Sequence, residues 1–130
     1  MVDRRQLRDI LKIEEMEVMG KIDRVQKPYY DIARVRALAL SGMVRFLERP
    51  DGKADPANVG MDENEALAIV AKLSLADFDM TVSDSRHPAN PPADVYKVKS
   101  LLLGRLFVQL YIKLSIRNDG RLLLIISFHK

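Results

Sequence analysis

The sequence predicts an α+β fold in which N-terminal helices pack on an antiparallel sheet formed mainly by the C-terminal half. Three observations support this prediction. Apolar residues recur at helical spacing in the first 75 residues, they alternate with polar residues between 105 and 117, and an Asn-Asp-Gly turn leads from there into a second apolar segment. Helices followed by turn-connected strands are typical of α+β proteins rather than of parallel sheets.

The helical half divides into three segments. Residues 3–25 carry an apolar stripe among many charges, and Pro28 interrupts this pattern. A second helix is expected from Asp31, which can act as its N-cap, to Gly42. A third opens where Asp62 and Glu65 have the spacing of a capping box. We therefore expect a helical extension over residues 1–26 and one domain over residues 27–130.

Shorter segments connect the helices to the strands. Residues 44–47 fit a short strand, and residues 50–60 are rich in Pro, Gly, Asp and Asn and are expected to form a loop. Ser74 begins a turn that leads into residues 78–82. Residues 83–92 contain His-Pro and Pro-Pro pairs that regular structure does not tolerate, so we expect a second loop there. Binding and catalytic residues lie on loops more often than on the helices and strands that the loops connect.

The last two strands are expected to pair as a hairpin. A two-residue turn at 119–120 would place apolar side chains of one strand opposite polar side chains of the other. A three-residue loop at 118–120 instead pairs apolar with apolar and polar with polar side chains. The second choice places Tyr111 opposite Ser127 and Gln109 opposite His129, with Lys113 close by. The hydrophobic pattern favours this register.

Charge is distributed unevenly along the chain. Residues 1–85 carry 13 Lys and Arg against 16 Asp and Glu, and residues 86–130 carry 8 against 2. A basic half on a small domain indicates a polyanionic partner such as RNA. Lys and Arg that protect an exposed strand edge from aggregation would explain the same pattern, and charge alone does not separate the two interpretations.

Composition excludes several classes of chemistry. The chain has no cysteine, which removes thiol catalysis and Cys-based zinc sites, and its two histidines lie 42 positions apart. Three aspartates, Asp77, Asp79 and Asp84, lack the partner ligands of a magnesium site, so capping or solvated roles are favoured. We expect no metal and no cofactor. The charged start and the lack of a long apolar run predict a cytoplasmic protein outside the membrane.

The polar face of the predicted hairpin has the residue types that cleavage of RNA requires. Histidine can accept and donate protons at neutral pH, tyrosine can donate a proton or a hydrogen bond, and lysine can stabilise charge on a phosphate. Tyr111, Lys113 and His129 are therefore candidate catalytic residues. A solvated and inert strand face is the alternative.

Several segments, taken in order, resemble the MqsR toxins. They are LSLADF at 73–78, DVYK at 94–97, LYIKLSI at 110–116 and IISF at 125–128, with RVRALALSGMVR at 34–45 upstream. The resemblance covers residues 27–130. It implies a RelE-like toxin fold and a type II toxin that cleaves mRNA without a metal ion and is neutralised by an antitoxin protein.

The resemblance also implies site residues. The family's strand tyrosine and the lysine two positions on correspond to Tyr111 and Lys113. The chain departs from the family at three positions: Asp79-Met80 stand where a lysine is usual, Ala93 replaces a glutamine, and His129 replaces a lysine. We expect His129 to take over proton transfer. The expected RNA-binding residues are Arg86, Tyr96, Lys97, Arg105, Gln109 and Ser127.

Two functions remain open on the sequence. The first is an mRNA-cleaving toxin with an antitoxin partner, in which residues 1–26 contribute to antitoxin binding or to a homo-oligomer. The second is a catalytically silent relative that kept the fold and binds RNA or the antitoxin. The substituted positions favour the second, whereas Tyr111, Lys113 and His129 favour the first.

Overall fold

The computed structural model describes residues 27–84, 86–102 and 106–130. The expected helix over residues 3–25 and the extension 1–26 lie outside this part of the chain. The described elements are α2 (Ile32–Leu40), β1 (Val44–Phe46), η1 (Pro56–Val59), α3 (Glu63–Val70), η2 (Leu75–Asp77), β2 (Phe78–Val82), β3 (Ala93–Leu102), β4 (Leu106–Arg117) and β5 (Leu122–His129). The predicted α+β class is confirmed.

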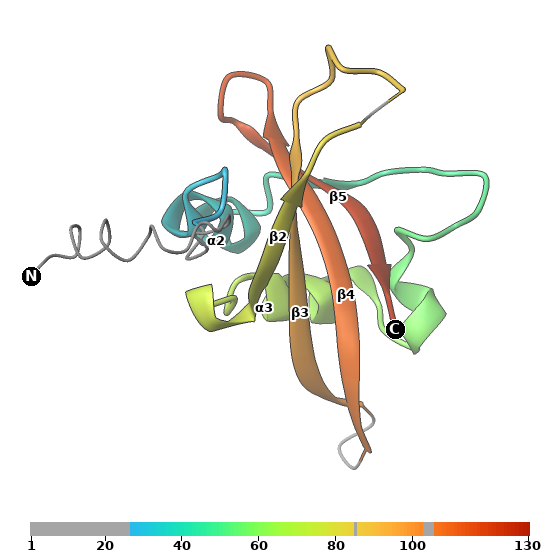
Figure 1. Ribbon diagram of the computed structural model, residues 1–130. Coiled ribbons are helices and arrows are strands. Elements are labelled where there is room, and N and C mark those ends of the chain that lie inside the picture. The colour runs from blue at the N-terminus through green and yellow to red at the C-terminus, as the bar shows by residue number, and fades with distance from the viewer. Residues whose placement is uncertain (1–26, 85, 103–105) are drawn as a thin grey trace, which may run out of the picture.

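The strands form one five-stranded sheet in the order β1-β5-β4-β3-β2. Helices α2 and α3 cover one of its faces (Figure 1). The core lies between them, where Val35 and Leu38 of α2 and Ala66 and Val70 of α3 meet buried residues of β3, β4 and β5. The opposite face of the sheet has no helix over it among the described residues.

Both described α-helices begin where local side-chain chemistry predicts. The Asp31 carboxylate accepts a hydrogen bond from the main-chain N–H of Ala33 at the start of α2. At α3, Asp62 accepts from the N–H of Glu65, and the Glu65 carboxylate accepts from the N–H of Asp62. Each contact satisfies an N–H group that the first turn of a helix leaves without an internal partner.

The sheet is mixed rather than purely antiparallel. Strand β1 runs parallel to β5, with Val44 opposite Leu123 and Phe46 opposite Ile125, while the other strand pairs are antiparallel. The connection from β1 to β5 contains α3 and strands β2 to β4, so it is long enough for β1 to enter the edge of the sheet in either direction. Three residues of strand are too few to reveal that direction in the sequence.

The predicted hairpin register is wrong by two residues. Tyr111 lies opposite His129 rather than Ser127, and Lys113 lies opposite Ser127. Two features shift the pairing: the loop between β4 and β5 spans four residues, 118–121, and a bulge interrupts β5 at Ile126. Asn118 and Asp119 both adopt left-handed conformations in this loop, with φ of 55° and 56°.

A buried carboxylate joins the helical layer to the sheet. Asp94 on β3 is completely buried. Its Oδ1 accepts hydrogen bonds from the N–H of Tyr29 at 2.9 Å and from the hydroxyl of Thr81 at 2.6 Å. Its Oδ2 accepts from the N–H of Tyr30 at 2.8 Å. Asp94 therefore holds the chain that enters α2 against β2 and β3.

Replacing Asp94 by alanine should lower the free energy of unfolding by about 3 kcal/mol, because three donors lose a fully buried acceptor at once. Urea unfolding followed by circular dichroism measures this. Asp79→Ala is the matched control, because Asp79 is exposed on the neighbouring strand and should leave the midpoint nearly unchanged. Equal midpoints for Asp94→Ala and the wild type would contradict the anchoring role.

Candidate functional site

The open face of the sheet carries polar side chains in register across three strands. Lys97 on β3 lies opposite Tyr111 on β4, and Tyr111 lies opposite His129 on β5. Directly paired residues of neighbouring strands project to the same face, so these three side chains form one row. The adjacent row, centred on Ile112, projects to the other face and is completely buried in the core.

Tyr111 and His129 stack on each other. Their ring centroids are 5.0 Å apart and the ring planes differ by 15°. The Nδ1 atom of His129 lies 2.8 Å from the main-chain oxygen of Lys130. Because that oxygen can only accept a hydrogen bond, Nδ1 carries the hydrogen, and Nε2 of the neutral ring is left as a proton acceptor.

Two lysines flank the stacked pair. Lys97 lies beside Tyr111 on β3, and its Nζ is 3.5 Å from the Asp79 carboxylate in an exposed ion pair. Lys113 is two residues from Tyr111 on β4, about 7 Å further along the same face, and is half-buried. An oxyanion held near the stacked rings would therefore meet positive charge from two directions.

Arg49 fastens the bulge of β5 to the loop that follows β1. Its Nη1 donates to the main-chain oxygen of Ile126 at 3.0 Å and to the hydroxyl of Ser127 at 2.9 Å. Its Nη2 forms an ion pair with Asp51 at 2.7 Å. A bulge leaves one residue outside the regular ladder, and Arg49 supplies the donor that the freed carbonyl needs. Sequence reasoning missed Arg49, because its partners lie 77 and 78 positions away.

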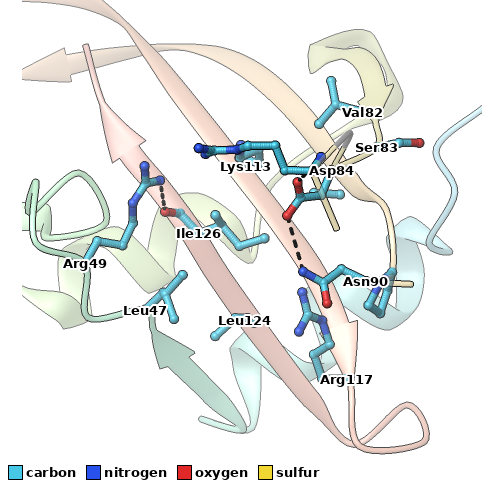
Figure 2. A pocket seen from close by; sticks show the side chains of 13 residues that line it. Leu47, Arg49, Val82, Ser83, Asp84, Asn90, Lys113, Arg117, Leu124 and Ile126 are labelled. Atoms are coloured by element: carbon cyan, nitrogen blue, oxygen red, sulfur yellow. Dashed lines mark hydrogen bonds between the residues drawn. The ribbon is translucent and has the colours of Figure 1, made fainter. Parts of the chain in front are cut away.

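An open cleft of about 510 Å³ lies next to this row of side chains. Lys113, which lies two residues from Tyr111 on the same face, lines this cleft together with Arg49, Arg86 and Arg117. Figure 2 shows Lys113 and Arg117 on β4, Arg49 beyond β5, and Asp84 on the loop around the same hollow. The cleft therefore brings four cations from three separate parts of the chain together.

The loop over residues 83–92 is organised by one aspartate. The Asp84 carboxylate accepts hydrogen bonds from the main-chain N–H of Arg86 at 3.0 Å and of His87 at 3.2 Å, and from the side-chain amide of Asn90 at 3.3 Å. Partial desolvation raises the pKa of Asp84, but these hydrogen bonds outweigh it, so its pKa lies below the usual value. Asp84 is therefore ionised at neutral pH and holds the loop at the rim of the cleft.

The structure brings most of the predicted site residues to the open face or the cleft. Tyr111, Lys113, His129 and Lys97 gather on the face, and Gln109 extends it opposite Lys99 on β3. Three other predicted site residues do not belong to this exposed group. Arg86 is exposed at the cleft. Ser127 is on the open face but almost completely buried, with its hydroxyl bonded to Arg49. Arg105 lies outside the described residues.

Tyr96 occupies the opposite side of the sheet from Tyr111. It is completely buried in the core and packs edge to face against Phe78, with ring centroids 5.6 Å apart. Burial raises the pKa of Tyr96 far above its usual value, with a smaller contribution from Asp94. The expectation that Tyr96 contacts RNA does not agree with this position, because neighbouring residues of a strand point to opposite faces.

No group of three or more His, Cys, Asp or Glu side chains within residues 27–84, 86–102 and 106–130 is arranged to hold a metal ion. In the same part of the chain, none of the helices has both the length and the apolar character needed to cross a membrane.

The fold and the site define an α+β protein with a cationic, tyrosine- and histidine-bearing sheet face. Residues 27–130 match the family model described as motility quorum-sensing regulator, toxin of MqsA. The protein belongs to this family, and the resemblance to the MqsR toxins is confirmed. Membership identifies it as a toxin of a toxin–antitoxin system and implies a cognate antitoxin. A search of curated proteins found no match.

Replacing Tyr96 by phenylalanine should leave RNA affinity unchanged and keep the free energy of unfolding within about 1 kcal/mol of the wild type, or raise it. The reason is that the Tyr96 hydroxyl is buried and has no hydrogen-bond partner among the described residues. Urea unfolding and an RNA gel-shift assay measure the two effects. The exposed Tyr29→Phe variant is the control, and weaker RNA binding by Tyr96→Phe at unchanged stability would contradict the assignment of Tyr96 to the core.

Proposed function

We propose that this toxin is an endoribonuclease that cleaves mRNA through attack by a 2′-hydroxyl and thereby inhibits translation. The observation that supports it most strongly is the stacked pair of Tyr111 and His129 on an exposed sheet face, with Lys97 and Lys113 beside it. The excess of Lys and Arg over Asp and Glu in residues 86–130 agrees with an RNA substrate.

The reaction requires three contributions from the protein. The 2′-oxygen loses its proton and forms a bond to the adjacent phosphorus. The bond between phosphorus and the 5′-oxygen then breaks, and that oxygen gains a proton. The products are a 2′,3′-cyclic phosphate and a 5′-hydroxyl. A base, an acid and a cation near the crowded phosphate are sufficient for this sequence, so no metal or cofactor is part of the proposal.

Each contribution has a candidate on the open face. His129 accepts the proton of the 2′-hydroxyl through Nε2, since Nδ1 already donates to the oxygen of Lys130. The Tyr111 hydroxyl donates a proton to the 5′-oxygen, and the Lys113 ammonium stabilises the additional negative charge on the phosphate. Arg49 acts as a positioning residue, because it holds the bulge of β5 three residues before His129.

The remaining cations bind the RNA strand. Lys97 and Lys99 on β3 extend the face along its long axis, with Gln109 opposite Lys99 on β4, and Arg86 adds positive charge at the cleft. Arg105 stays a prediction from the sequence. Contacts of this kind are electrostatic and weaken as the salt concentration rises.

One observation favours the alternative of a catalytically silent relative that binds RNA or the antitoxin. Asp79 pairs with Lys97 at 3.5 Å and so reduces the positive charge available beside Tyr111. This pair is exposed, and a pair of that kind contributes little to binding or stability. It therefore reduces the charge on the face without removing the groups that transfer protons.

Purified protein should cut a long RNA in EDTA and leave 2′,3′-cyclic phosphates, and His129→Ala should lose about 10²- to 10⁴-fold in rate, the usual contribution of a general base. End mapping by sequencing measures the cuts. His87→Ala is the matched control, because His87 is the other histidine of the chain and is exposed on the loop over residues 83–92.

A second pair of variants separates chemistry from folding. Tyr111→Phe removes one hydroxyl and keeps the ring that stacks on His129, whereas Tyr29→Phe removes an exposed hydroxyl on the opposite side of the sheet. Slower cleavage in Tyr111→Phe alone supports the role of Tyr111. Wild-type RNA binding without cleavage, both on free RNA and on translating ribosomes, would replace this proposal by the silent relative.

A further inference from the structure

The cleft beside Lys113 has the size of a small-ligand site. Its volume of about 510 Å³ falls within the range of roughly 300 to 1,000 Å³ that is usual for such sites. Lys113 lines it and, opposite Ser127, lies two residues along the same sheet face from Tyr111 and His129. A polymer whose phosphate is held at Lys113 therefore has its neighbouring unit at the mouth of the cleft.

The lining of the cleft suits one nucleotide. Val82, Leu124 and Ile126 provide an apolar surface against which the flat face of a base can pack. Arg86 and Arg117 contribute guanidinium groups at the side, and only Nε of Arg117 is bonded within the described part of the chain, to the Ser115 hydroxyl at 2.8 Å. These groups match the apolar base and the anionic phosphate of a nucleotide.

The rim of the cleft presents hydrogen-bond acceptors. The side-chain nitrogen of Asn90 lies 3.3 Å from the Asp84 carboxylate, which can only accept a hydrogen bond when ionised. This contact fixes the orientation of the Asn90 amide and leaves its carbonyl oxygen available to accept a hydrogen bond from a ligand. Figure 2 shows Asn90 beside Asp84, joined to it by this hydrogen bond.

We propose that this cleft is a subsite for the nucleotide next to the scissile phosphate and that it selects a base with an exocyclic amino group over uracil. The place of the subsite next to the scissile phosphate rests on the proposed function. The amino group of cytosine, adenine or guanine donates to the Asn90 carbonyl oxygen, which the contact with Asp84 orients. Uracil instead presents two carbonyl oxygens, one on either side of its N–H group. Each of these oxygens is itself an acceptor, so it is repelled by the acceptor oxygens at the rim of the cleft.

Binding of short probes that cannot be cleaved tests the subsite directly. The probes are 2′-deoxy tetranucleotides of uracil in which one position at a time is changed to cytosine, and their affinities are measured by fluorescence anisotropy. For the wild type, cytosine at one position should bind about tenfold more tightly than uracil there, the typical contribution of one hydrogen-bonded base contact. Asn90→Ala should abolish this preference and leave the affinity for the all-uracil probe unchanged.

The Arg117→Gln variant tests the phosphate contact separately. It should weaken all probes equally and reduce the slope of log affinity against log salt by about 0.7, as expected for the loss of one phosphate contact to a single strand. Arg121→Gln is the matched control, because Arg121 is exposed in the loop between β4 and β5 and does not line the cleft.

Three results would overturn the subsite: no preference for cytosine in the wild type, a preference that survives in Asn90→Ala, or an equal loss of both probes in Asn90→Ala. If these results accompanied RNA cleavage in EDTA, the subsite would fail and the proposed function would stand. A cytosine preference that depends on Asn90, in a protein that does not cleave RNA, would support the cleft as a nucleotide site and refute the proposed function.

Discussion

The buried carboxylate of Asp94 is the interaction on which the arrangement of the two layers depends. It accepts hydrogen bonds from the entry to α2 and from β2 while it is itself part of β3. Burying a carboxyl group is costly unless its oxygens accept hydrogen bonds, so these three contacts stabilise the packing of the two layers. With the helical layer held on one face, the other face of β3, β4 and β5 has no helix over it in the described part of the chain. The candidate site lies on that face.

Features that depend on neighbouring residues could be predicted from the sequence. The N-cap at Asp31 and the capping box at Asp62 involve contacts over two or three positions, so the sequence pattern contains all of their partners. Strict alternation in β4 likewise identified the face that carries Tyr111 and Lys113. The same alternation is absent in β3, because residues 93–96 are buried on both faces of the sheet, so the sequence pattern did not reveal that Tyr96 lies in the core.

Features that depend on distant residues could not be predicted. The hairpin register follows from a four-residue loop and from the bulge at Ile126, and Arg49 stabilises that bulge from a different part of the chain. The cleft likewise is lined by residues that are far apart in the sequence, among them Arg49, Arg86 and Arg117. The wrong hairpin register affected the predicted site, because it placed His129 opposite Gln109 instead of Tyr111. In the structure, Tyr111 and His129 stack on each other.

The central claim, that the 2′-hydroxyl is the nucleophile, is tested most directly by changing the RNA instead of the protein. One mapped cleavage site is synthesised with a single 2′-deoxynucleotide on the 5′ side of the scissile phosphate, within an RNA that keeps a second, unmodified site. If the 2′-hydroxyl is the nucleophile, cleavage is lost at the modified site and continues at the unmodified one. Cleavage at both sites at equal rates would contradict it, because the modified nucleotide has no 2′-oxygen to attack.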